Sequence, residues 1–152
     1  MILRIVLFLI INFTALAIGG IFTGKGVPSD WYQSLNKAPW TPPGWVFGAA
    51  WSLIMACLAI YMAYAWNIVE NKKVFLGFFV VQWFLNVLWN PTFFYYHNTL
   101  LGLIIISALS LLMIAFFIAY LPDLKYKSLL LLPYIVWLLI ATSLNLYIVF
   151  KN

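Results

Sequence analysis

The chain has 152 residues, of which 66% are hydrophobic, 20% are aromatic and only 7% are charged. A soluble domain of this length could not bury so much apolar surface, so the composition excludes an ordinary soluble protein and indicates a membrane protein. The formal net charge is +5, but the eight Lys and Arg occur singly or in pairs, without the basic patch or stripe that nucleic-acid binding requires. We therefore expect no nucleic-acid partner, and we expect the positive charge to contact anionic lipid headgroups.

Five apolar runs follow one another, and each is near the roughly 20 residues that a transmembrane helix needs. They cover residues 5–22, 45–66, 74–96, 100–121 and 129–150. One long connection separates the first two runs, and the other connections are short, which implies antiparallel neighbours. The sequence therefore predicts an all-α integral membrane protein. We expect a single domain, residues 1–152, that forms a bundle of five transmembrane helices with a structured loop between helices 1 and 2.

The first run has a second reading as a cleavable signal peptide, because Arg4 precedes an apolar core and the small-residue sequence Ala15-Leu16-Ala17. Apolar sequence continues through Phe22, which makes the run long enough to span a membrane. We therefore expect a retained helix, in which Gly20-x-x-x-Gly24 offers positions for close helix packing.

The stretch 31–51 holds four of the eight Trp and three of the seven Pro. Proline suits the first turn of a helix, so Pro42-Pro43 should end an ordered loop and start the second helix. Large amphipathic rings beside rigid prolines make a poor flexible linker, and we interpret this stretch as a lid over a pocket. Phe47 and Trp51 would lie on the first turns beneath it. Trp31 and Trp40 are interpreted as bundle filler or interface anchors, and the same interpretation stays open for Trp51.

The third run carries a polar stripe, because Gln82, Asn86 and Asn90 recur at every fourth residue and so share one helix face. Amides are costly in hydrocarbon, so this face must point into the bundle. Hydrogen bonds between helices and the polar wall of a ligand pocket are two compatible readings of the stripe. Pro91 should bend the helix near its end.

The fifth run repeats this arrangement, with Tyr134, Trp137, Ala141 and Asn145 at helical spacing. We expect Pro133 to loosen the helix and Ala141 to leave room beside the Trp137 indole for a flat guest. Bundle filler or interface anchor is the alternative reading of this Trp.

Acid–base chemistry has no visible set of residues, because no Asp, Glu, Lys or Arg falls inside a predicted span. The same absence argues against an ion-coupled pump. The only histidine, His97, is interpreted as a solvated loop-end residue, and we expect no metal site. Whether the protein is an enzyme stays open on the residues alone.

The distribution of basic residues predicts the orientation in the membrane. One side receives five of them, Arg4, Lys72, Lys73, Lys125 and Lys127, and the other receives Lys25, Lys37 and Lys151. The first set should be cytoplasmic, which places the amino terminus inside and the aromatic loop outside.

Three motifs occur in order along the chain. They are W-Y-x-x-L-x-K-x-P-W from Trp31 with x-P-P-x-W-x-F-x-x-x-W ending at Trp51, W-x-x-N-x-x-W from Trp83, and P-Y-x-x-W-x-x-x-A-x-x-x-N from Pro133. Together they resemble the TspO/MBR family, which includes the tryptophan-rich sensory protein of bacteria and the mitochondrial translocator protein, or peripheral-type benzodiazepine receptor. The similarity covers essentially the whole chain. The family's lysine and proline are usually adjacent, whereas Ala38 lies between them here.

The resemblance implies a membrane receptor, commonly a homodimer and here in a bacterial cell membrane, that binds porphyrins such as protoporphyrin IX. It also implies binding of synthetic isoquinoline-carboxamide and benzodiazepine-type ligands. The matching motifs give the ligand-binding residues Tyr32, Phe47, Trp51, Trp83, Asn86, Phe93, Trp137, Ala141 and Leu144. Some bacterial members promote light-dependent oxidative degradation of porphyrin, which implies a catalytic role for Trp51 and Trp137. Animal members bind cholesterol, but the pattern from Leu144 to Lys151 is weak, and we do not expect a sterol partner.

A porphyrin suits these residues physically, because it is a flat apolar disc with carboxylates along one edge. Trp51 and Trp137 would face each other as walls, Asn86 and Tyr32 would donate or accept hydrogen bonds, and Lys25 or Lys37 would pair with a carboxylate. The sequence shows no credible axial ligand for a metal, which favours a metal-free porphyrin as the ligand or substrate. We expect that the protein requires no cofactor. The alternatives are a transporter of tetrapyrroles or other lipophiles, and a regulatory protein whose loop contacts a partner.

Overall fold

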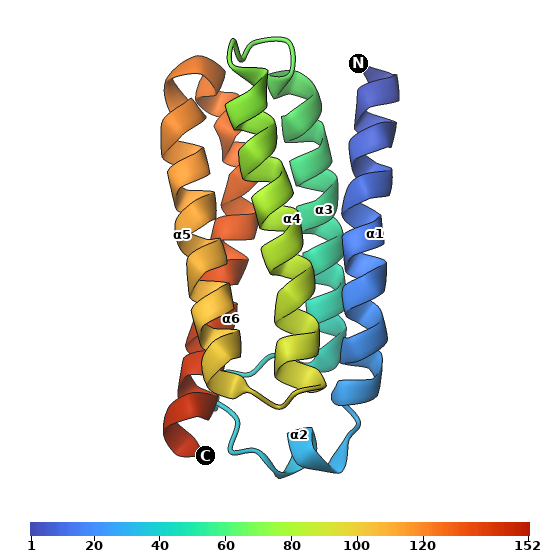
Figure 1. Ribbon diagram of the computed structural model, residues 1–152, viewed down its shortest axis with the longest axis vertical. Coiled ribbons are helices and arrows are strands. Elements are labelled where there is room, and N and C mark those ends of the chain that lie inside the picture. The colour runs from blue at the N-terminus through green and yellow to red at the C-terminus, as the bar shows by residue number, and fades with distance from the viewer.

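The computed structural model describes residues 1–152 as a bundle of long antiparallel helices without strands (Figure 1). The elements are α1 (Ile2–Gly26), α2 (Asp30–Ser34), α3 (Gly44–Ala65), α4 (Lys72–Phe94), α5 (Thr99–Leu124), the 3-10 helix η1 (Lys125–Leu131) and α6 (Leu132–Lys151). Helices α1, α3 and α4 and the continuous segment Thr99–Lys151 are long and apolar enough to cross a membrane. Because that segment reverses at η1, it supplies two crossings, and the predicted bundle of five transmembrane helices is confirmed.

Polar side chains start the helices that follow the short connections. Asn71 caps α4 by accepting a hydrogen bond from the Val74 amide at 3.2 Å, and Asn98 caps α5 by accepting one from the Leu101 amide at 2.9 Å. Such caps satisfy amides that have no partner within the helix. Pro43 directly precedes α3, as the sequence predicts. The turn from α5 into η1 is made at Lys125, which has a positive φ of 49°.

Two predicted boundaries differ from the structure. Helix α1 extends to Gly26, beyond the predicted end at residue 22, and the connection that follows contains the short helix α2. The fifth run does not begin as an α-helix, because residues Lys125–Leu131 form η1 and α6 starts at Leu132. Pro133 therefore lies in the first turn of α6, where its missing N–H costs no helical hydrogen bond, and the expectation that it loosens the helix is wrong.

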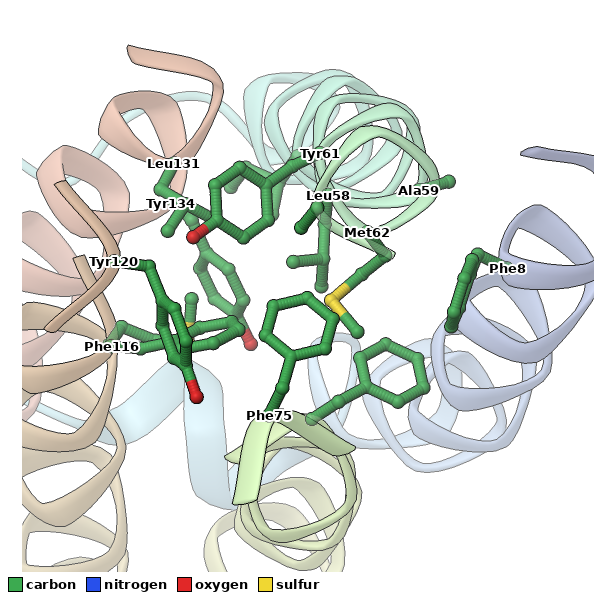
Figure 2. Close-up of a cluster of buried hydrophobic side chains, with 14 of the residues drawn as sticks. Phe8, Leu58, Ala59, Tyr61, Met62, Phe75, Phe116, Tyr120, Leu131 and Tyr134 are labelled. Atoms are coloured by element: carbon green, nitrogen blue, oxygen red, sulfur yellow. The ribbon is translucent and has the colours of Figure 1, made fainter. Parts of the chain in front are cut away.

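The two ends of the bundle differ in how they are filled. The amino terminus, the α3–α4 connection and η1 lie at one end, and α2 and the carboxyl terminus lie at the other (Figure 1). At the amino-terminal end, aromatic side chains from α3, α4 and α5 fill the space between the helices (Figure 2). Tyr61 packs edge-on against Phe116 with ring centroids 5.5 Å apart, and Phe75 packs likewise against Tyr120 at 5.2 Å. This half of the bundle is a closed hydrophobic core.

Candidate ligand-binding cavity

The half of the bundle next to α2 encloses a cavity of about 380 Å³. Its walls come from the carboxyl-terminal halves of α1, α4 and α6, the first turns of α3, and the connection between α1 and α3, whereas α5 contributes no lining residue. Most of the lining surface is apolar. The size and the character are those of a small-molecule site, for which about 300–1,000 Å³ is typical.

The cavity is capped by α2, which packs on the end of α4. Trp31 stacks on His97 with ring centroids 4.0 Å apart and planes inclined by 11°. Tyr32 packs against Phe93 and Phe94 at 6.3 and 5.5 Å. His97 is exposed and does not line the cavity, in agreement with its interpretation as a loop-end residue.

The second half of the cap is attached to α6. The Trp40 indole N–H donates to Ser143 Oγ at 3.1 Å, and its ring lies edge-on to Tyr147 at 5.5 Å. The Asn36 amide donates to Asn152 Oδ1 at 2.9 Å. These contacts hold the connection against both α4 and α6, so it is a structured lid, as predicted, and Trp40 bonds to the protein in addition to lying exposed.

The polar stripe on α4 joins helices and also reaches the cavity. Asn86 Nδ2 donates to the Tyr134 hydroxyl at 2.7 Å, and that hydroxyl donates to Gln82 Oε1 at 3.0 Å. Asn90 Oδ1 accepts from Thr23 Oγ1 at 2.8 Å, which ties α4 to α1. Hydrogen bonding between helices is therefore confirmed. Asn86 also lines the cavity, and its role as part of a ligand pocket stays a prediction.

Seven of the nine predicted ligand-binding residues line the cavity: Tyr32, Phe47, Trp51, Asn86, Phe93, Ala141 and Leu144. Trp83 does not, because its ring lies between α1 and α4 and its N–H donates to the Ile11 carbonyl at 3.0 Å.

Trp137 is also absent from the cavity wall. It is 7% exposed and lies behind Phe47, with ring centroids 5.3 Å apart and planes at 83°. Trp51 instead packs edge-on against Tyr134 at 5.7 Å. The two indoles therefore do not face each other as walls in this structure, and a role of Trp137 in binding stays a prediction.

Two kinds of lining residue were missed by the sequence reading. Trp89 and Asn145 line the cavity and bond to each other, since the Trp89 N–H donates to Asn145 Oδ1 at 3.1 Å. Both residues belong to the motifs quoted from the sequence, and those motifs are the signal that could have identified them as lining residues. Small residues of α1 also line the cavity. Gly19 lies close against the Asn90 amide, whereas Gly20, expected only as a position for close helix packing, has open space beside it.

The polar groups of the cavity are few and directed. Lys37 is the only charged lining residue, and its ammonium donates to the carbonyls of Tyr32 and Gln33 at 2.9 and 3.3 Å. Since an ammonium has three donors, one remains for a ligand. Burial raises the pKa of the Tyr32 phenol above its usual value of 10.0, so the hydroxyl stays a neutral donor. The hydroxyl of Tyr32 and the indole N–H of Trp51 have no hydrogen-bond partner in the protein.

The chain is similar in sequence to several known proteins. The model of the TspO/MBR family matches residues 6–151. Over 135 residues, 88% of this chain and 87% of the relative, the sequence is 39% identical to the tryptophan-rich protein TspO of Archaeoglobus fulgidus. It is 34% identical to protein CrtK of Rhodobacter capsulatus over 85% of this chain and 80% of that protein. It is 30% identical to the human translocator protein over 88% of this chain and 83% of that protein. The chain belongs to the TspO/MBR family.

Proposed function

We propose that this protein is a membrane receptor that binds porphyrins, protoporphyrin IX in particular, in the capped cavity. The observation that carries the proposal is a mostly apolar cavity with aromatic walls and a single cation at its lid. Synthetic isoquinoline-carboxamide and benzodiazepine-type ligands, which are also flat and aromatic, would occupy the same space.

The lining residues complement each part of a porphyrin. Phe47, Trp51 and Phe93 offer faces and edges to a flat ring, and Ala141 leaves space between them. The third donor of Lys37 would pair with a propionate at the edge of the ring. No His, Cys or Met lines the cavity, so the residues suit a metal-free ring better than a coordinated haem.

Light-dependent oxidation of the bound porphyrin is the second part of the proposal. The excited ring would take an electron from the Trp51 indole, which lines the cavity, and would pass it to dioxygen to give superoxide. The indole radical cation would regain its electron from the ring, and the oxidised ring would then combine with superoxide, so that the ring is oxidised and dioxygen is the oxidant. Trp137 would act through Phe47, which lies between it and the cavity.

The test is titration of purified protein with protoporphyrin IX, followed by fluorescence quenching and then by absorbance under visible light. Trp51→Phe should weaken binding several-fold and slow the light-dependent loss of absorbance, because it removes an indole that lines the cavity. Trp45→Phe is the matched control, since Trp45 lies on the same helix but is 75% exposed. Equal behaviour of the two variants would contradict the assignment of the cavity as the site.

A receptor fits the structure better than a transporter. The cavity occupies the half of the bundle next to α2, and the other half is filled by the aromatic core of Tyr61, Phe75 and Phe116 (Figure 2). No ionisable side chain lines the cavity apart from Lys37 and Tyr32 at the lid, so no coupling ion has a pathway.

We further propose that the protein resides in a bacterial cell membrane with its amino terminus inside. Five of the eight Lys and Arg lie in the first turn of α1, at the start of α4 and in η1. These segments lie at the end of the bundle that holds the amino terminus (Figure 1). The excess of basic residues is the usual mark of the cytoplasmic side. A cysteine placed at Asn71 should be labelled by impermeant reagents only after cells are opened.

A further inference from the structure

A second hollow lies on the outside of the bundle, between α1 and α4, at the end opposite the lid. It measures about 400 Å³ and is lined only by apolar side chains: Leu7, Phe8, Ile11, Trp66, Leu76, Phe79, Val80, Trp83 and Phe84. It shares no residue with the capped cavity. Apart from Trp66, which directly follows α3, its lining residues lie on candidate membrane spans. Leu7, Val80 and Phe84 are exposed, so the groove would open toward lipid in a membrane.

Two cations stand on the same helix faces as the lining residues, one turn nearer the membrane surface. Arg4 precedes Leu7 and Phe8 by three and four residues on α1, and Lys72 precedes Leu76 by four residues on α4. Residues three and four apart lie one above the other on a helix. The groove therefore has a basic group at the surface end of each of its two walls.

The contacts of these cations bring both to the end of α3. The Arg4 guanidinium donates to Asn67 Oδ1, and the Lys72 ammonium lies 5.8 Å from the centre of the Trp66 ring. Trp66 itself lines the groove, and an indole at the end of a membrane-spanning helix commonly contacts headgroups. The guanidinium has further donors, and neither cation makes an ion pair, so both are available to an anion.

The surrounding charges reinforce this basic end. Lys73 adds to it, and the exposed carboxylate of Glu70 is the acidic group of the α3–α4 connection. The end of the groove thus carries a net positive charge.

We propose that this groove binds a phospholipid with an anionic headgroup, with one acyl chain along the apolar walls and the phosphate between Arg4 and Lys72. A tail beside a negative head matches an apolar groove that ends in two cations. A second copy of the chain fits less well, because a symmetric partner would bring its own Arg4 and Lys72 toward these and place like charges together. The site is independent of porphyrin binding in the capped cavity.

The experiment measures quenching of tryptophan fluorescence by lipids with brominated acyl chains, in nanodiscs of phosphatidylcholine. One arm contains a minor fraction of brominated phosphatidylglycerol, and the other contains the same fraction of brominated phosphatidylcholine. The difference between wild type and Trp83→Phe isolates the signal of the groove, since Trp83 lines it. We expect phosphatidylglycerol to quench this signal at lower mole fraction than phosphatidylcholine.

Charge variants test the headgroup contact. Arg4→Gln with Lys72→Gln should lower the preference for phosphatidylglycerol about 25-fold, since each basic group near an anionic surface contributes about fivefold. Arg4→Lys with Lys72→Arg should keep it. Lys125→Gln with Lys127→Gln removes equal charge from the same end of the bundle and should leave it unchanged. Unchanged protoporphyrin quenching in all variants would show that the bundle and the capped cavity are intact.

Three results would overturn the proposal. Equal quenching by the two lipids would show that the groove does not select a headgroup. If Arg4→Gln with Lys72→Gln and Lys125→Gln with Lys127→Gln lowered the preference for phosphatidylglycerol equally, the effect would be one of overall charge and not of the groove. Quenching by neither lipid, together with a dimer whose dissociation exposes Trp83, would make the groove a subunit interface.

Discussion

Lys37 is the only charged residue that lines the cavity, and its ammonium lies over the ring of Tyr32, five residues earlier in the chain. Its ammonium lies 4.8 Å from the centre of the Tyr32 ring and bonds to backbone carbonyls, so its direction is fixed before a ligand arrives. The extra Ala38 of this chain does not move the lysine away from the cavity. Under the proposed function, this cation would contact the acidic edge of the porphyrin.

Lys37→Gln should weaken binding of protoporphyrin IX about fivefold to tenfold, because the charge-assisted contact with a propionate is lost. The dimethyl ester of the porphyrin has no carboxylate, so its affinity should change little. Titrations of both ligands against both proteins give the comparison. If Lys37→Gln lowers the affinity for the ester and for the free acid equally, the lysine stabilises the lid and does not contact the ligand's carboxylate.

Tyr134 connects two amides of α4 through one hydroxyl. Tyr134→Phe leaves Asn86 Nδ2 and Gln82 Oε1 without these partners and should lower the free energy of unfolding by about 0.5–2 kcal/mol. Tyr126→Phe is the control, because Tyr126 is 75% exposed. Reversible unfolding in mixed detergent micelles measures both, and equal stability of the two variants would show that the buried bonds contribute nothing net.

Among the elements, the connection between α1 and α3 covers one end of the cavity. It is attached to α4 through Trp31 and Tyr32, and to α6 through Trp40 and Asn36. The prolines predicted its order, but not α2, because a five-residue helix is too short to show a periodic pattern. The contacts with α6 join residues more than one hundred positions apart, which no local pattern reveals.

Trp40→Ala should speed both association and dissociation of porphyrin, about tenfold, because the lid loses its hydrogen bond to Ser143 and its packing on Tyr147. Stopped-flow fluorescence measures the two rates. Trp45→Ala removes an exposed indole from the neighbouring helix and should leave both rates unchanged. A fall in affinity without faster rates would place Trp40 in binding and not in the lid.

Over the whole molecule, the bundle followed from the apolar runs because each run had to satisfy its backbone hydrogen bonds inside the membrane. The apolar runs did not predict how deeply individual side chains lie within the bundle. Trp137 and Ala141 lie one turn apart on α6, yet only Ala141 reaches the cavity, since Phe47 from α3 covers the indole. Which residue covers which depends on how the helices are rotated against each other, and helical spacing alone leaves that rotation free.

Flux through the bundle tests the arrangement of its two halves. Liposomes that contain the protein should take up porphyrin no faster than protein-free liposomes, because the aromatic core closes the half opposite the lid. Phe116→Ala opens that core and is the informative comparison. Faster uptake with the wild type would establish a transport pathway and displace the receptor proposal.

The core of Tyr61, Phe75 and Phe116 fills the half of the bundle beyond the cavity. If the cavity holds a ligand as proposed, that ligand would have to leave through the half of the bilayer by which it entered. Its occupancy would then report the ligand's concentration on one side of the membrane, as a sensor does.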